Sequence, residues 1–266
     1  MARQMLTDDL WKRIKDLLPR PSSPGPRGGR PPVDNRTALA GILFVLNAGI
    51  RWEDLPIQFG CSGMTCWRRL RDWNEAGVWQ KLHEVLLAEL NAADKLDWSR
   101  AVIDSGSVRA MGGGEKTGPN PTDRAKPGTK HHVITDAQGV PLAISVTAAN
   151  RPDVMEIIPL TVNIPPVKGR RGRPRQRPDS LQGDRGYDSN DARGILAWLG
   201  IKPILAKRNT EHGSGLGVTR WVVERTISWL HNFRRLRIRW DRRSDIHEAF
   251  SKLAACLICL NVFILA

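Results

Sequence analysis

The chain has 266 residues, 41% of them hydrophobic, which is enough for one large core or two modest ones. Lys and Arg outnumber Asp and Glu by 41 to 27, and the formal charge of +14 favours a polyanionic partner such as nucleic acid. A membrane surface is also anionic, but the most apolar run, Leu253 to Ala266, is too short to span a bilayer and the amino terminus has no apolar leader, so we expect a cytoplasmic protein with no membrane partner.

The first predicted element is an amphipathic helix from Thr7 to Leu18. Thr7 is a good N-cap, acids occupy the first turn, and Pro19 ends the helix. Residues 19–36 are dense in Pro, Gly and Arg and cannot bury enough apolar surface to fold by themselves. This segment is either a solvated linker or an arm that follows a DNA groove.

The next elements suggest a helix-turn-helix reader of DNA. Asn35 to Ala48 reads as a buried helix, another helix ends near Phe59, and Gly60 to Gly63 form a turn. The helix after the turn has an apolar side made by Trp67, Leu70 and Trp73. Three arginines point the other way: Arg68, Arg69 and Arg71. A second helix of this kind enters the major groove, although a purely structural helical hairpin has the same pattern.

The periodicity changes from helical to strand-like near Lys95, which predicts a helical domain at 1–95 and a second domain at 96–266. A strand from Asp97 is expected to end at Asp104, and a Gly-rich excursion follows it. The runs KHHVITD and VPLAISVTA then form a β-hairpin around a turn at Ala137 to Gly139.

The rest of the chain alternates helices and strands. A short helix at Asp153 to Leu160 precedes a strand ending at Asp184, a helix through Trp198, the strand IKPILAK and a long helix. This order predicts an α/β fold, a mixed sheet with flanking helices. Two basic runs, Lys168 to Arg177 and Arg234 to Arg243, are suited to DNA phosphates. The candidates from these runs are Arg170, Arg171, Arg173, Arg234 and Arg235.

Four cysteines, two of them as Cys256 and Cys259 in a C-x2-C, leave a zinc site open if Cys61 and Cys66 join them in space. The C-x2-C lies in an apolar run without a turn, so we favour buried thiols that pack as small hydrophobic side chains.

The long helix from Val218 to Arg242 has a polar stripe on which Glu224 is the single acid among several cations, Arg220, His231 and Arg235. Asp104 and Asp184 are each expected at a strand end, where an Asp is usually a turn former or a cap. Taken together, the three acids form a set with a chemical purpose. Mg²⁺ prefers carboxylate oxygens, and two such ions can support an in-line phosphoryl transfer.

The segments VIDSGSVRA, GDRGYDS and TRWVVERTISWLHNFRRL closely resemble the DDE transposases of bacterial insertion sequences, in the insertion-sequence-five group of the wider insertion-sequence-four assemblage. LTDDLWKRIKDLLP and RWEDLPIQFG are similar to that group's DNA-binding region. The resemblance implies a ribonuclease H-like catalytic domain preceded by an all-α, helix-turn-helix-like domain. Its signature around the Glu is Tyr, two residues, Arg, three residues, Glu, six residues, Lys. Here Arg220 and Glu224 match, but Gly217 replaces the Tyr and His231 replaces the Lys. His231 is kept as a candidate for DNA contact, because a His can donate to a phosphate although it is fully charged only when protonated.

The resemblance further implies an enzyme with two Mg²⁺ ions, replaceable by Mn²⁺, held by Asp104, Asp184 and Glu224. Water would release a 3′-hydroxyl at an element end, and that hydroxyl would attack target DNA. Arg185 and Arg220 would contact nearby phosphates, or else pair with the active-site acids. The implied partners are double-stranded DNA, at terminal inverted repeats and target sites, and further copies of the chain in a nucleoid-associated oligomer.

Three other readings remain open at this stage. A ribonuclease H-like nuclease or resolvase would cut DNA without joining it. A transposase-derived repressor would bind DNA without chemistry, although all three acids are present. A general DNA-packaging protein would account for the charge, but not for the three acids in the strand-rich half.

Overall fold

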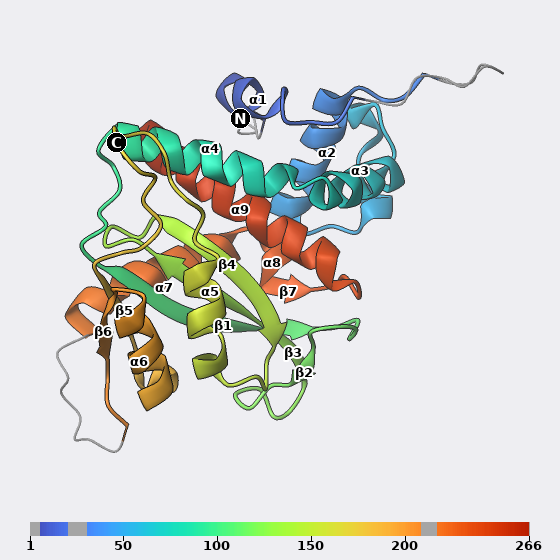
Figure 1. Cartoon of the computed structure of the whole chain (residues 1–266). Helices are drawn as coiled ribbons and strands as arrows, with labels where there is room; N and C mark the ends of the chain where they lie inside the picture. Colours follow the sequence, from blue (N-terminus) through green and yellow to red (C-terminus); the bar gives the residue numbers. More distant parts are fainter. Residues whose placement is uncertain (1–5, 21–30, 209–216, 266) are drawn as a thin grey trace.

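The computed structural model describes residues 6–20, 31–208 and 217–265 (Figure 1). Most of the Pro- and Gly-rich segment at 19–36 therefore lies outside the described residues, and so do residues 209–216.

The first part of the chain is helical, as the sequence predicted. Thr7 caps the first helix by accepting a hydrogen bond from the Leu10 amide at 3.2 Å. Asp34 and Ser62 cap the second and third helices in the same way. The helices are α1 (Asp8–Ile14), α2 (Asn35–Ala48), α3 (Gly63–Glu75) and α4 (Val78–Ala92).

The expected helix ending near Phe59 is wrong. The chain there forms two 3₁₀ turns, η1 (Trp52–Asp54) and η2 (Ile57–Phe59). Leu55 between them is extended, with φ −61° and ψ 123°, because the following Pro56 disfavours the helical conformation in the residue before it. The α-helix that precedes the turn at Gly60 to Gly63 is therefore α2, which ends before both 3₁₀ turns.

The second part contains a mixed sheet in the order β4-β3-β1-β5-β6. Strands β1, β3 and β4 are antiparallel neighbours, while β5 runs parallel to β1 and β6 parallel to β5. This arrangement confirms the predicted α/β fold, a mixed sheet with flanking helices. The strands are β1 (Ala101–Ala110), β3 (Pro127–Thr135), β4 (Pro141–Ala148), β5 (Ser180–Gly183) and β6 (Lys202–Leu205), with short β2 (Gly118–Pro119) and β7 (Ile238–Arg239) at the margins.

Strand β1 runs through Asp104 and does not end there, contrary to the prediction. Pairing with β3 continues from Val102↔Thr135 to Arg109↔Gly128, and this ladder keeps the chain extended across Gly106. Gly106 lies under another helix, where an added Cβ would come within 3.0 Å of Ile227 and 3.1 Å of His231. The glycine that suggested a loop is therefore a point of close packing inside a strand.

Helices cover both faces of the sheet. One face carries η3 (Asp153–Met155), α5 (Ile157–Val162) and α6 (Asn190–Trp198), and the other carries α7 (Gly217–Asn232) and α9 (Ser244–Leu265), with α8 (Arg234–Arg237) between them (Figure 1). The apolar run from Leu253 belongs to the closing helix α9, which begins at Ser244 and lies between α4 and the sheet. By length and composition, Ser244–Ile264 could span a membrane, yet 72% of the apolar window is buried inside the protein.

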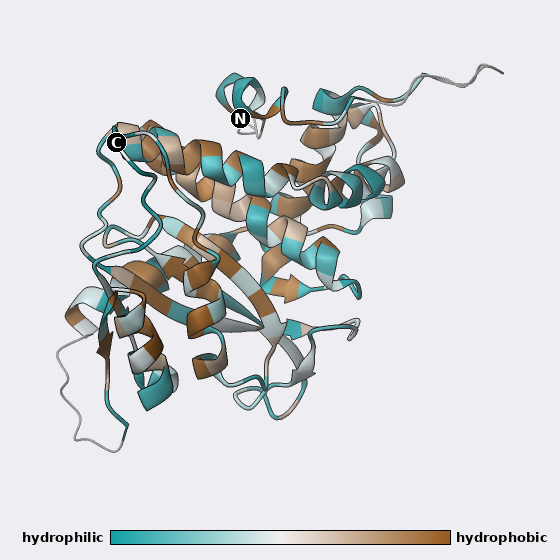
Figure 2. Cartoon of the chain, viewed as in Figure 1, coloured by the Kyte–Doolittle hydropathy of each residue, from teal (hydrophilic) through white to brown (hydrophobic). Residues whose placement is uncertain are grey.

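One hydrophobic core connects the two parts of the chain. Leu43 of α2, Leu86 of α4, Val102 of β1 and Phe250 of α9 belong to the same cluster of buried side chains. Figure 2 shows hydrophobic residues along the central strands and on the helices above them. The change from helix to strand falls between Ala92 and Ala101, but a division into domains at 1–95 and 96–266 stays a prediction.

Cys256 and Cys259 are buried in this core as free thiols. Their Sγ atoms lie 3.4 Å and 3.8 Å from the carbonyl oxygens of Trp79 and Pro141, to which they donate weak hydrogen bonds.

Candidate active site

The fold brings the three predicted acids together where α7 packs on β1. Asp104 lies in the middle of β1, and Asp184 directly follows β5. The parallel register pairs Ala101 with Leu181 and Val102 with Gln182, so its continuation places Asp104 opposite Asp184. Glu224 reaches the same place from α7, which packs on β1.

Arg220 lies among these acids, one helical turn before Glu224. Its Nη2 is 2.9 Å from Glu224 Oε1, and its Nη1 is 3.6 Å from Asp184 Oδ2. The Asp184 carboxylate is also held locally, because its Oδ1 accepts a hydrogen bond from the Gly186 amide at 2.8 Å. One guanidinium thus bridges acids supplied by two different elements.

Asp104 is the most buried of the three acids. Burial raises the pKa of its carboxyl group to about 6, and the nearby charges of Asp184 and Glu224 raise it as well. The Ser105 amide and the Arg220 charge lower this pKa, but they do not cancel the effect of burial. The site therefore concentrates more negative charge than Arg220 neutralises, which is what a site for hard cations requires. In the described part of the chain no three Asp, Glu, His or Cys side chains already stand close enough to hold one ion, and Arg220 occupies the space between Asp184 and Glu224.

The raised pKa of Asp104 predicts a gain in stability when this acid is made neutral. Because the folded-state pKa lies above the unfolded value, Asp104 weakens the fold progressively as pH rises from about 4 to about 6. We expect Asp104→Asn to raise the free energy of unfolding of the metal-free protein by about 1–3 kcal/mol near pH 8, and by much less near pH 4. Urea unfolding in the presence of a chelator, measured across this range, tests it. A difference that does not change with pH would contradict the raised pKa.

The arginines of α3 differ in how far they are free to contact DNA. Arg68 is exposed. Arg69 is half-buried, and its Nη2 donates to the Val33 carbonyl at 3.4 Å. Arg71 is half-buried too, pairs with Asp72 at 2.6 Å and lies over the Trp67 ring. Of the three arginines predicted to point outward, only Arg68 is therefore exposed, and the other two are half-buried.

The basic loop and the segment after α7 also divide into exposed and engaged side chains. Arg171, Arg173 and Arg234 are exposed. Arg170 pairs with Asp94 and donates to the Asn91 carbonyl at 3.1 Å. Arg185, directly after Asp184, is half-buried beside the acids.

Arg235 is the clear correction, because it is buried and not on the exposed polar stripe that the sequence predicted. Only 4% of its side chain is exposed, and it pairs with Asp241 at 3.0 Å and donates to the Ile50 carbonyl at 2.7 Å. The predicted stripe assumed one unbroken helix, but α7 ends at Asn232 and Phe233 is extended before α8 begins. His231, just before this break, is half-buried and contacts His131 at 3.1 Å.

Sequence reasoning missed Asp153, which connects the elements that carry the acids. Its Oδ1 accepts from Ser105 Oγ at 3.0 Å and from Lys130 Nζ at 2.8 Å. Its Oδ2 lies 3.4 Å from where a Cβ on Gly186 would be. An Asp after Pro152 is an ordinary way to begin a helix, so no sequence signal distinguished it.

Two family models match the chain. One, described as "Putative transposase of IS4/5 family", matches residues 6–83, and "Transposase DDE domain" matches residues 99–260. The "Putative transposase for insertion sequence element IS402" of Burkholderia cepacia is 60% identical over 162 residues, which are 61% of this chain and 75% of the relative. "Uncharacterized protein y4sN" of Sinorhizobium fredii is 37% identical over 105 residues, 40% of this chain and 76% of that protein.

Among solved structures, the catalytic domain of Mos1 mariner transposase is 12% identical, covering 73% of this chain and 92% of its own, at a TM-score of 0.28. The family models and the relative at 60% identity are sufficient to assign the chain to a family, and they agree with the resemblance seen in the sequence. The chain belongs to the DDE transposases, in the insertion-sequence-four and -five family.

Proposed function

We propose that Asp104, Asp184 and Glu224 hold two Mg²⁺ ions, replaceable by Mn²⁺, with which this transposase cuts the ends of its insertion sequence and joins them to target DNA. The observation that carries the proposal is the convergence of acids from β1, β5 and α7 around Arg220. DDE transposase domains use divalent metal ions, which, when bound, activate the attacking oxygen and stabilise the leaving oxygen of a phosphodiester.

The three acids differ in their freedom to move. Asp104 is held within a paired strand, and Asp184 is held by the Gly186 amide. Glu224 is 51% exposed on a helix and can rotate away from Arg220 when cations arrive. Arg220 would then be released toward a DNA phosphate beside the reacting one, and Arg185, the residue after Asp184, would contact a neighbouring phosphate.

Exposed cations would hold the duplex. Within the part of the chain that the structure describes, no ion pair engages Arg68, Arg171, Arg173 or Arg234, in contrast to Arg170 and Arg235. We assign them to the phosphates of the terminal inverted repeats and the target, with more than one copy of the chain in the complex. Each phosphate contact steepens the salt dependence of binding.

The test uses a labelled duplex that carries the flanking element end, a target plasmid and the wild-type protein. We expect nicks that leave a 3′-hydroxyl, followed by joined products, with Mg²⁺ or Mn²⁺, and neither product with Ca²⁺ or a chelator. Cleavage without joining would identify a nuclease or resolvase. Binding of the end without chemistry in either metal would identify a repressor.

A further inference from the structure

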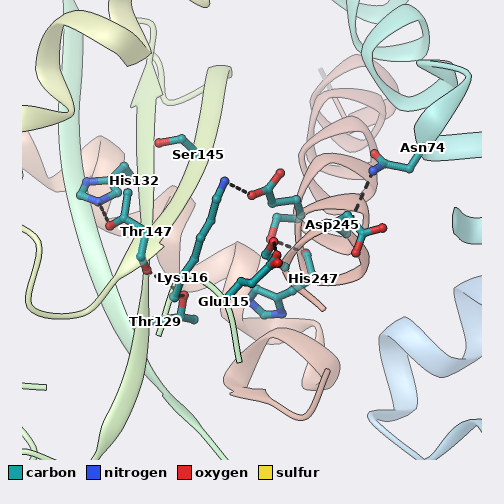
Figure 3. Close-up of polar contacts among 12 residues, drawn as sticks. Asn74, Glu115, Lys116, Thr129, His132, Ser145, Thr147, Asp245 and His247 are labelled. Carbon is teal, nitrogen blue, oxygen red and sulfur yellow. Dashed lines mark hydrogen bonds and ion pairs between the residues drawn. The ribbon is translucent and has the colours of Figure 1, made fainter. Parts of the chain in front are cut away.

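Three histidines form a chain of hydrogen bonds beside the site. His131 of β3 lies on the face covered by α7 and α9, where its Nδ1 is 3.1 Å from His231 Nε2 and its Nε2 is 2.8 Å from His247 Nε2. His131 and His247 are fully buried, while His231 is half-buried at the surface end. The neighbouring His132 points to the opposite face of the sheet and bonds Thr147 instead (Figure 3).

The surface end of this chain lies next to the three acids. His231 follows Glu224 by seven residues, two turns along the same side of α7. Its ring lies over Gly106, two residues beyond Asp104 on β1 and on the same face of the strand. His231 therefore lies on the same side of α7 as Glu224 and over the same face of β1 as Asp104.

All three rings are neutral near pH 7. Burial lowers the pKa of His131 well below its usual value and that of His247 to about 3, and the cations Arg239 and Arg235 lower the pKa of His247 further. Burial and Arg237 lower the pKa of His231. A neutral imidazole has one N–H donor and one bare acceptor nitrogen, so each contact in the chain must receive its proton from one side.

Only two arrangements of protons satisfy both contacts. They differ in which nitrogen of His247 carries the proton, so the surroundings of His247 determine which arrangement forms. His247 Nδ1 is buried and has no hydrogen-bond partner among the described residues, and the positive charge of Arg239 acts on this ring. An N–H there would be an orphaned donor facing a cation, which costs more than a bare nitrogen. His247 must then donate from Nε2 to His131 Nε2, and His131 from Nδ1 to His231 Nε2.

We propose that His131 and His247 are positioning residues that keep neutral His231 in its Nδ1–H form, so that it offers a hydrogen-bond donor to a DNA phosphate next to the reacting one. The phosphate contact rests on the proposed function, whereas the proton arrangement does not. No protein partner accepts from His231 Nδ1 among the residues that the structure describes, so this N–H is available to a ligand.

The geometry argues against two other roles for the chain. A metal centre would need the three rings to converge on one point, but His131 uses opposite nitrogens for its two neighbours. A proton relay would need an exit at each end, but the chain stops at the unpartnered Nδ1 of His247. The remaining role is to keep the proton of His231 on Nδ1.

The first test is the tautomer itself, measured by long-range ¹H–¹⁵N correlation of the histidine rings in the full-length protein near pH 7, with His231→Gln used for assignment. We expect the Nδ1–H form at His231 in the wild type. We expect a mixture in His247→Phe, which removes the donor at the buried end. An Nε2–H form of His231 in the wild type overturns the inference, even if His247→Phe fails to fold.

The second test separates the two ring nitrogens by function. The side-chain amide of Asn lies close to where His Nδ1 would be, and that of Gln close to Nε2. We expect His231→Asn to bind a labelled element end within about threefold of the wild type, and His231→Gln to bind about tenfold more weakly or worse. The reverse order contradicts the inference. Loss of metal-dependent cleavage in the wild type with the Nδ1–H form intact would count against the proposed function alone.

Discussion

Asp104→Asn, Asp184→Asn and Glu224→Gln are each expected to lower the rate of DNA cleavage at least about 10³-fold, since each removes an anionic oxygen ligand worth several kcal/mol to the transition state. The replacements keep the shape of the side chains, so the Asp184 variant can still accept the Gly186 amide. Affinity for the element end should stay within about threefold, because the exposed arginines that we assign to phosphates are unchanged.

The control for this series is Asp191→Asn, an exposed acid seven residues after Asp184, which should cleave like the wild type. A readout independent of activity is thermal unfolding. Mg²⁺ should raise the midpoint of the wild type by binding the folded state, and much less that of the three variants. A variant that cleaves at the wild-type rate and still responds to Mg²⁺ would remove its residue from the site.

The largest expected loss of stability comes from breaking the buried pair between Arg235 and Asp241. Both side chains are less than a tenth exposed, at 4% and 8%, and lie 3.0 Å apart. Arg235→Met leaves Asp241 as an unpaired buried charge, so we expect a loss of about 3–5 kcal/mol in the free energy of unfolding. Urea unfolding near pH 7 measures it.

Two comparisons make this result specific. The double variant Arg235→Met with Asp241→Leu should recover part of the loss, because it removes the unpaired charge as well. Asp123→Asn breaks the surface pair with Arg109, whose side chains are 34% and 38% exposed, and should cost less than about 1 kcal/mol. Equal destabilisation by Arg235→Met and Asp123→Asn would contradict a larger effect of the buried pair.

The sequence was sufficient to predict the order of strands and helices, because strand-like and helical periodicities alternate clearly after Lys95. It also singled out the three acids as candidates, because a lone Glu on a cationic helix and two Asp residues near strands could together bind metal ions. Their convergence, by contrast, depends on the parallel register of β1 and β5 and on the packing of α7 over Gly106. Contacts between segments far apart in the chain leave no local pattern.

The errors have the same origin. Gly106 looked like the start of a loop, because a sequence does not show that the Ile227 and His231 side chains need the space of its missing Cβ. Arg235 looked exposed, because helical spacing was extended past Phe233, where the chain turns inward to meet Asp241. The histidine chain could not be predicted from the sequence, because its members come from three separate elements, β3, α7 and α9.

The position of α9 also determines when during synthesis the protein can fold. This helix is the layer between α4 and the sheet, yet it is translated after both of them. Until it emerges from the ribosome, the apolar faces that α4 and β4 present to α9 stay uncovered, and neither layer has a complete core. Stable binding of DNA by a nascent chain is therefore not expected, and a product cut short before Ser244 should be cleared by proteolysis and not compete with the intact enzyme for its element ends.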